Sequence, residues 1–386
     1  MAEWLAERSA EGDQSAVTIQ LDRRAAIGGL GAAAMAAAAG AQLVGHRPSR
    51  KLGYAIVGLG YYATRMIMPH FVNCTHSRLT ALVSGTPAKL EQYGSEYKIP
   101  AGSRYSYADF DRIRDNADVD IVYVVLPNSM HAEYTIRAAR AGKHVLCEKP
   151  MAVSSAECET MIAACRAAGR KLMIGYRSHF QPHNIHAMRL AGEGAIGKRR
   201  FVQSEHGFPI NNPAQWRLNR ELSGGGSMMD IGIYSVQALR YMAGEEPISV
   251  AATENTDRND PRFREVEDRI AWNFLYPSGL IGQGFSSYSS GHNHIRLTGD
   301  GGWIDLEPGT SYDGQHMRVR RGGDDAQDVT PPKGPGANQF AAQLDHLAIS
   351  ILENREPMAG GGEGLQDLRL IEAIYRSAKE GRTVTL

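Results

Sequence analysis

The sequence predicts an α/β protein of two domains: an N-terminal domain built on a parallel sheet, and a C-terminal α+β domain with a large, mostly antiparallel sheet. Three observations support this prediction. The chain has 386 residues, enough for two domains of ordinary size. Apolar strand-like runs alternate with helical stretches from Gly53 to Tyr176, which is typical of a parallel sheet with crossover helices. After about Phe201, strand-like runs follow one another with turns between them, as in an antiparallel sheet.

Residues 1–41 have the features of a twin-arginine export signal. Arg23 and Arg24 precede a mildly apolar run of alanines and glycines at 27–45, and Ala39-Gly40-Ala41 fits a small-residue cleavage site. This run is a poor membrane span, so no stable membrane anchor is expected. A retained N-terminal helix or anchor is the alternative. We therefore expect a bacterial protein that folds inside the cell and is exported to the periplasm by the twin-arginine route.

The first strand of the parallel sheet is predicted at Tyr54–Val57, and a G-x-G-x-x-A loop follows it directly. Gly58 and Gly60 permit a tight turn and the close approach of a pyrophosphate, and Ala63 lets the next helix pack close to the sheet. The amino end of that helix offers free N–H groups to phosphates. Alone, the motif also fits a tight turn without a ligand. Because strands and helices keep alternating after it, we predict a dinucleotide-binding Rossmann domain over residues 53–176, with an N-terminal arm at 42–52.

The end of the second strand, Leu79–Val83, indicates which dinucleotide binds. An NAD-binding chain usually places Asp or Glu here to bind the ribose 2′-hydroxyl. This chain has Ser84-Gly85-Thr86 instead, and Lys89 adds a positive charge. A 2′-phosphate would be repelled by an acid but is accommodated by hydroxyl groups and a lysine. The sequence therefore predicts NADP rather than NAD.

Polar residues follow two further strands at the edge where ligands bind in such sheets. The strand at 120–126 ends in the loop Pro127–His131, and the helix Ala132–Ala141 leads to a short strand that ends in Glu148-Lys149-Pro150. Pro150 prevents a helix from starting at Lys149, so the lysine is fixed at the carboxyl end of a strand. A lone lysine there would more often be an exposed loop residue. Its position beside the predicted dinucleotide loop favours a functional role.

The second half of the chain is predicted as a substrate-binding and oligomerisation domain at 177–386. One face of its sheet should be covered by helices, and the other face is a candidate for homo-oligomer contacts. Asp230 and Tyr234 are four residues apart on the first of these helices and should share one face. The predicted strands are Phe201–Glu205, Ile248–Glu254, Arg269–Leu275, Leu280–Tyr288, His294–Gly299 and Met317–Arg320, and the predicted helices are Gly224–Met242, Asn338–Glu353 and Gly364–Lys379.

Composition excludes several classes of function. The 42 basic and 42 acidic residues balance, so no net charge attracts nucleic acid or an anionic membrane. The four cysteines, Cys74, Cys147, Cys158 and Cys165, form no metal-binding pattern and are interpreted as free thiols in the core. His292 and His294 alternate along a predicted strand and could share a face. Because no third ligand is in view, we expect no metal site.

Taken together, the motifs resemble the glucose–fructose oxidoreductase/inositol dehydrogenase superfamily. The resemblance runs from Gly53 to about Thr383 and includes the twin-arginine leader. It is strongest with the branch of glucose–fructose oxidoreductases and aldose–aldose oxidoreductases. The stretches that carry it are Tyr54–Gly60, Leu126–His131, Gly142–Met151, Lys171–Arg177, Gln215–Leu218, Gly224–Tyr234 and Asn338–His346.

The resemblance implies roles for individual residues. Lys149 matches the catalytic lysine, Tyr234 the tyrosine that this branch uses as its acid–base group, and Asp230 an aspartate that binds a sugar hydroxyl. A tyrosine can accept the proton of a sugar hydroxyl when an ammonium such as that of Lys149 stands beside it. The implied cofactor-binding residues are Gly58, Gly60, Tyr61, Tyr62, Ser84, Lys89, Tyr107, Leu126, Pro127, Asn128, His131, Glu148, Lys149, Arg177, Trp216 and Arg217.

The resemblance also implies an NADP-dependent sugar oxidoreductase with a tightly bound cofactor, assembled as a homodimer or homotetramer. It would oxidise an aldose to an aldonolactone and reduce a second sugar to a polyol by ping-pong transfer, and the 42–52 arm would help hold the cofactor. Two stretches, Phe208–Asn212 and Gly291–His294, depart from the branch near the expected substrate entrance, which favours an aldose over fructose as acceptor. The alternatives are an ordinary NADP-dependent sugar dehydrogenase or anhydrofructose-type reductase with exchangeable cofactor and, more remotely, a non-catalytic dinucleotide-binding sensor.

Overall fold

The computed structural model describes residues 50–331 and 338–386. The predicted export signal and residues 42–49 of the predicted arm lie outside these ranges. The first strand, β1, begins at Leu52, one residue before the predicted start of the Rossmann domain. Residues 51–386 pack as one compact unit. Within the described ranges, none of the helices combines the length and apolar character needed to cross a membrane.

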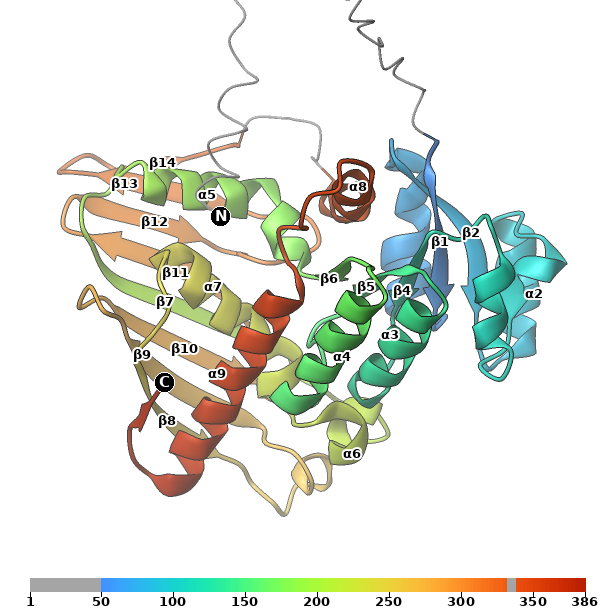
Figure 1. Cartoon of the computed structure of the whole chain (residues 1–386). Helices are drawn as coiled ribbons and strands as arrows, with labels where there is room; N and C mark the ends of the chain where they lie inside the picture. Colours follow the sequence, from blue (N-terminus) through green and yellow to red (C-terminus); the bar gives the residue numbers. More distant parts are fainter. Residues whose placement is uncertain (1–49, 332–337) are drawn as a thin grey trace, which may run out of the picture. The chain divides into compact units, whose positions relative to one another are not determined.

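The N-terminal half contains the predicted parallel sheet (Figure 1). Its strand order is β3-β2-β1-β4-β5-β6, and all neighbouring strands are parallel. The order reverses at β1, so the carboxyl ends of β1 and β4 flank the crevice in which a doubly wound sheet binds its ligand. The strands are β1 Leu52–Val57, β2 Ser77–Val83, β3 Arg104–Tyr105, β4 Ile121–Val124, β5 His144–Cys147 and β6 Leu172–Ile174, and the helices are α2 Pro87–Glu96, α3 His131–Arg140 and α4 Ser155–Ala167.

Local sequence explains these elements. Every residue of β1 and β4 is buried, as expected for central parallel strands covered on both faces. Ser154 caps α4 by accepting a hydrogen bond from the backbone N–H of Glu157 at 3.3 Å. Gly142 has a φ of 77°, which suits the residue that ends α3.

The C-terminal half contains a nine-stranded sheet in the order β14-β13-β12-β11-β7-β10-β9-β8-β15. Neighbouring strands are antiparallel except for the central pair β7 and β10, which is parallel. The strands are β7 Arg199–Gly207, β8 Ser249–Asn255, β9 Arg269–Leu275, β10 Ile281–Ser287, β11 His292–Gly299, β12 Gly302–Leu306, β13 Met317–Arg321, β14 Gln327–Asp328 and β15 Val384–Thr385, and the helices are α5 Pro182–Gly192, α6 Arg220–Ser223, α7 Ile233–Ala243, α8 Gln339–Leu352 and α9 Gly361–Glu380.

Helices α5, α7 and α9 cover one face of this sheet (Figure 1). The alternating burial along β9 shows the two faces directly, since every second residue is buried. On the opposite face Leu275 and Ile281 are 44% and 47% exposed. This face is uncovered within the described part of the chain, as the prediction of one helix-covered face requires.

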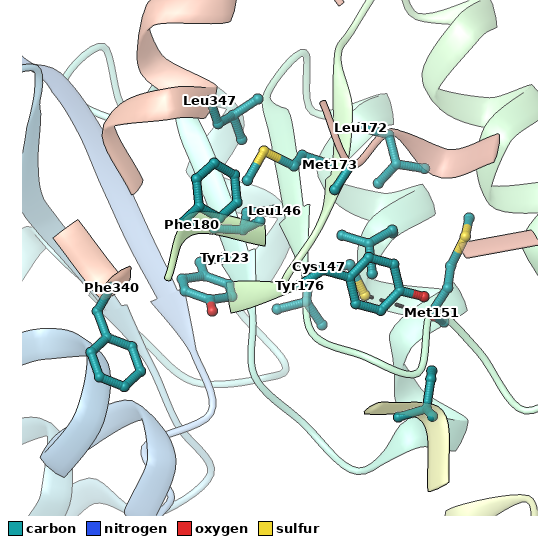
Figure 2. Packing of buried hydrophobic residues seen from close by; sticks show 14 of the residues in the cluster. Tyr123, Leu146, Cys147, Met151, Leu172, Met173, Tyr176, Phe180, Phe340 and Leu347 are labelled. Carbon is teal, nitrogen blue, oxygen red and sulfur yellow. Dashed lines mark hydrogen bonds between the residues drawn. The ribbon is translucent and has the colours of Figure 1, made fainter. Parts of the chain in front are cut away.

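The two halves share one core, because the last two helices return to the Rossmann sheet. The Tyr54 hydroxyl on β1 donates to the Leu344 carbonyl on α8 at 2.7 Å. The backbone N–H of Ile174 on β6 donates to the Ala359 carbonyl, just before α9, at 2.8 Å. Figure 2 shows the result, with Phe340 and Leu347 of α8 packed beside residues of β4, β5 and β6. The boundary at residue 176 therefore marks a change of topology within one packed unit.

Candidate active site

Lys149 lies where the two halves meet, just after β5. Its ammonium nitrogen is 2.5 Å from the backbone carbonyl oxygen of Asp230 and 3.6 Å from the Asp230 carboxylate. The same nitrogen lies 4.7 Å from the centre of the Tyr234 ring. The structure thus brings together the three residues that the sequence predicted as catalytic.

Asp230 is held in its ionised form by its neighbours. Its carboxylate forms an ion pair with the Arg217 Nε at 2.9 Å and accepts a hydrogen bond from the Tyr288 hydroxyl at 3.0 Å. Burial alone would raise the pKa of Asp230, but Arg217, Lys149 and Tyr288 together keep this pKa below its ordinary value. Tyr288, at the end of β10, was missed by the sequence analysis, because nothing local distinguishes it from a core tyrosine.

Tyr234 is the second residue of α7, and polar and charged side chains from other elements surround it. Its hydroxyl oxygen accepts a hydrogen bond from the Arg177 Nε at 3.2 Å. The buried His206 ring on β7 lies 5.7 Å from the Tyr234 ring, and burial lowers the pKa of His206 to about 3, so this imidazole is neutral. The sequence analysis also missed His206, because its position near Tyr234 depends on how β7 packs against α7.

The glycine run before Asp230 is required by close packing. A Cβ on Gly225 would lie 2.3 Å from the Tyr375 hydroxyl, and one on Gly226 would lie 2.1 Å from the Glu267 carbonyl oxygen. The Glu267 carboxylate accepts hydrogen bonds from the backbone N–H of Gly226 at 2.8 Å and of Met228 at 2.9 Å. This buried carboxylate, which the sequence analysis missed, therefore fixes the start of the π-helical turn Met228–Gly232 that carries Asp230.

Glu148 and His131 contact the backbone of the loop that carries Lys149. Burial raises the pKa of Glu148, although the Tyr123 hydroxyl, which donates to it, and Lys149 oppose this shift. The two ring nitrogens of His131 lie 2.8 Å and 2.9 Å from the carbonyl oxygens of Pro150 and Leu126, and the ring is fully buried. His131 therefore links the loops that follow β4 and β5, and its assignment to the cofactor site stays a prediction.

The loop after β1 fits a dinucleotide phosphate. Gly58 has a φ of 96°, and a Cβ there would lie 2.2 Å from the Val125 carbonyl oxygen, so the fold itself requires this glycine. At Gly60 an added Cβ would meet no atom within 4 Å. The chain does not use this space, and an approaching pyrophosphate can fill it.

Several other predicted cofactor residues have contacts that fix their positions. The Lys89 Nζ donates to the Leu59 carbonyl at 2.9 Å, which places it beside the glycine loop. The buried Ser84 hydroxyl accepts from the Thr86 N–H at 3.1 Å, and a Cβ on Gly85 would lie 3.0 Å from the Tyr107 ring. The remaining ones are also positioned by the structure: Asn128 is buried and donates to the Ser223 carbonyl at 2.8 Å, Tyr61 is 73% exposed, and Arg217 stacks on Trp216 at 4.6 Å.

These contacts predict opposite effects of alanine at the two glycines. Gly60→Ala should fold with an unfolding free energy within about 1 kcal/mol of the parent, because its methyl group enters free space, yet it should retain much less cofactor. Gly58→Ala should lose more than about 2 kcal/mol, because it combines a left-handed backbone with a clash. Denaturation of cofactor-free protein and the cofactor content after gel filtration measure both effects. Parental cofactor content in Gly60→Ala would contradict the assignment of this loop.

The two histidines of β11 lie away from this site. His294 pairs in register with Glu205, whereas the adjacent pair of Asn293 with His206 faces α7. The expectation that the stretch Gly291–His294 lies near the substrate entrance stays a prediction, and its two histidines point to the sheet face opposite that of Asn293. Asn293 does face the site: its side-chain oxygen accepts from the Thr310 N–H at 2.8 Å and so holds the turn that contacts Arg177.

His294 has carboxylate neighbours that the sequence analysis did not identify. Ligand atoms of His294, Asp305 and Glu307 lie within 4.8 Å of one another. However, the Asp305 carboxylate is already paired with Arg318 at 2.9 Å and with Arg296 at 3.5 Å. The cluster therefore has its own counter-charges and gives no reason to assign a metal.

A Rossmann domain whose Lys149 meets an aspartate and a tyrosine of a second domain defines a nicotinamide-dependent oxidoreductase. Residues 52–176 match the family described as "Oxidoreductase family, NAD-binding Rossmann fold", and residues 190–386 match its "C-terminal alpha/beta domain". The chain belongs to this family, which confirms the predicted glucose–fructose oxidoreductase/inositol dehydrogenase superfamily.

Three similar proteins have names that identify them as enzymes of sugar oxidation or reduction. The crystal structure of aldose-aldose oxidoreductase from Caulobacter crescentus, complexed with glycerol, is similar with a TM-score of 0.86 and 62% identity, covering 87% of this chain and 100% of that one. D-xylose 1-dehydrogenase [NADP(+)] of Haloarcula marismortui is 29% identical over 86% of this chain and 92% of its own. The 1,5-anhydro-D-fructose reductase of Ensifer adhaerens is 28% identical over 76% of this chain and 87% of its own.

Proposed function

We propose that this protein is an NADP-dependent sugar oxidoreductase that keeps its cofactor bound, oxidises an aldose to an aldonolactone and reduces a second sugar to a polyol. The observation that carries the proposal is the contact of Lys149 with both Asp230 and Tyr234 at the carboxyl edge of the Rossmann sheet. The 62% identity to an aldose-aldose oxidoreductase supports the substrate class. NADP is supported by the absence of an acid after Val83, by Ser84 and Lys89, and by the name of the xylose dehydrogenase relative.

The site residues supply what this reaction needs. The Gly58–Gly60 loop, Ser84 and Lys89 would hold NADP, which would supply the hydride chemistry of both half-reactions. Tyr234 takes the proton of the anomeric hydroxyl in the first half-reaction and gives a proton to the carbonyl oxygen in the second. Lys149 and Asp230 form a fixed ion pair beside Tyr234, which can orient a sugar hydroxyl between charged groups.

The proposal includes where the protein acts and how it assembles. The twin-arginine pair before residues 27–45 supports export of the folded protein to the periplasm. A cofactor that stays bound suits that compartment, because the enzyme then needs no free NADP. Exposed Leu275 and Ile281 on the uncovered sheet face support a homodimer or homotetramer built through this sheet.

Absorbance of the purified protein tests the proposal. We expect reduced nicotinamide to appear when an aldose is added, to disappear when a second sugar is added, and to remain with the protein through gel filtration. Loss of the cofactor on the column, together with turnover that needs added NADP, would support the exchangeable dehydrogenase or reductase, which the names of two relatives favour. No redox change with any sugar would favour the non-catalytic sensor.

A further inference from the structure

Arg177 is a buried cation whose hydrogen-bond acceptors are all neutral. The side chain follows β6 in the turn Arg177–Phe180, and the residue is 4% exposed. Its guanidinium donates to the Thr310 carbonyl at 2.5 Å, to the Gln339 side-chain oxygen at 2.9 Å and, from Nε, to the Tyr234 hydroxyl at 3.2 Å. A buried charge is costly unless an opposite charge is near.

Two aromatic rings lie close to this guanidinium. Its central carbon lies 4.9 Å from the centre of the Tyr234 ring and 4.6 Å from that of Tyr312. Among residues 50–331 and 338–386, no carboxylate lies within ion-pair distance of Arg177. The charge of Glu148 is felt at longer range, since Arg177 lowers the pKa of that carboxyl against the larger effect of burial.

Lys149 differs from Arg177 in having a counter-ion and in its position relative to Tyr234. Its ammonium already has a counter-ion in Asp230, and it lies over the face of the Tyr234 ring rather than at the oxygen. In the described chain, the side chain that donates a hydrogen bond to the Tyr234 oxygen is Arg177. The sequence analysis had assigned the role of activating cation to Lys149 alone.

We infer that Arg177 is a positioning residue that acts through Tyr234: it directs the phenol proton away from itself toward the substrate side, and it is the counter-ion of the phenolate. The inference rests on the proposed function and deepens it. When Tyr234 gives its proton to the carbonyl oxygen of the acceptor sugar, the phenolate becomes the anion that Arg177 lacks. When the phenolate takes the proton of the next aldose hydroxyl, the neutral hydrogen bond is restored, so protons balance over the two half-reactions.

Other titratable and charged groups lie around Tyr234. They are Lys149, Glu148, Asp230, His206, Tyr62, Tyr312 and Arg177. The experiment below leaves all of them in place except Arg177 or its immediate partner.

The test measures the ionisation of Tyr234 directly. Tyrosinate absorbance is titrated in the purified holoprotein and in its Tyr234→Phe form, and the difference gives the Tyr234 transition. The same pair of titrations is made with Arg177→Gln and with Gln339→Glu, which places a carboxylate where the amide oxygen now lies 2.9 Å from Arg177. We expect both changes to move the transition upward by about one pH unit or more. Arg189→Gln, a half-exposed arginine paired with Glu193 on α5, is the matched control and should not move it.

A transition that stays in place in Gln339→Glu would overturn the inference, even if Arg177→Gln fails to accumulate as folded protein. A merely structural Arg177 would lower activity at every pH without moving the transition. Because the titration needs no sugar, it separates this inference from the proposed function: a shifted transition in a protein that oxidises no aldose would refute only the latter. Where aldose reduces the cofactor, the acidic limb of that rate should move in parallel with the absorbance.

Discussion

Tyr234→Phe should lower the rate at which an aldose reduces the bound cofactor by about 10²–10⁴-fold, the usual contribution of a positioned acid–base group. The ring remains, so its contacts with Lys149 and Arg177 should persist. The Arg177 Nε loses its acceptor, however, and an unsatisfied buried donor costs about 1–3 kcal/mol of stability. Stopped-flow absorbance gives the rate, and chemical denaturation gives the stability.

The control for this change is Tyr93→Phe, which removes a hydroxyl from a half-buried tyrosine on α2, remote from the cluster. It should leave the rate within about twofold, because surface-proximal changes of this kind have small effects. Cofactor content should be the same in both variants. If Tyr234→Phe reduces its cofactor at the parental rate, another group takes the proton, and the assignment of Tyr234 fails.

Local pattern predicted most of the scaffold. The parallel sheet was predicted from the glycine loop and from apolar strand-like runs that alternate with helices. The order of its strands comes from the structure. The sheet strands at Arg269–Leu275 and Met317–Arg321 were found within one residue of their ends. Helix α5, which opens with Pro182, and strand β12, with Gly302 at its start, were missed, since their polar or glycine-rich openings look like loops.

Only those site residues that belong to a recognisable family motif could be predicted from the sequence. Lys149, Asp230 and Tyr234 were identified, but the contacts that tune them come from segments far away in the chain. Tyr288, which follows β10, reaches Asp230, and β10 pairs in parallel with β7, a pairing that the expected mostly antiparallel sheet did not specify. Gln339 reaches Arg177 because α8 returns across the Rossmann half. Such long-range contacts leave no local periodicity, so sequence pattern cannot indicate them.

The largest stability effect is expected at Arg240 on α7. Its guanidinium pairs with Asp367 of α9 at 2.7 Å, with Glu363 at 3.0 Å and with Glu246 at 2.5 Å, and Asp367 is fully buried. Arg240→Met keeps an apolar side chain of similar length but leaves Asp367 without a counter-ion. Removing one partner of a buried ion pair typically costs about 3–5 kcal/mol. We therefore expect a loss of this size at neutral pH, measured by denaturant unfolding of the cofactor-free protein.

The pH dependence of this loss identifies its cause. Burial already raises the pKa of Asp367, against the opposing effect of Arg240, so removal of Arg240 should raise that pKa further. An acid whose pKa is higher in the folded state binds more protons there than in the unfolded state, so its contribution to stability falls as pH rises between the two values. Arg240→Met should therefore be less destabilising in mildly acidic buffer, at about pH 5, than at neutral pH.

A second substitution separates charge from packing at this site. Asp367→Asn in the Arg240→Met background removes the uncompensated carboxylate while keeping an acceptor for the Gln237 amide, which now donates to Asp367 at 2.9 Å. The double variant should recover part of the lost stability at neutral pH and lose the pH dependence, because no buried group is left to protonate. Arg189→Met breaks an ion pair with Glu193 at the surface of α5. It should cost no more than about 0.5 kcal/mol of stability. Equal losses at both pH values would instead mean that Arg240 stabilises α7 and α9 through packing of its aliphatic chain.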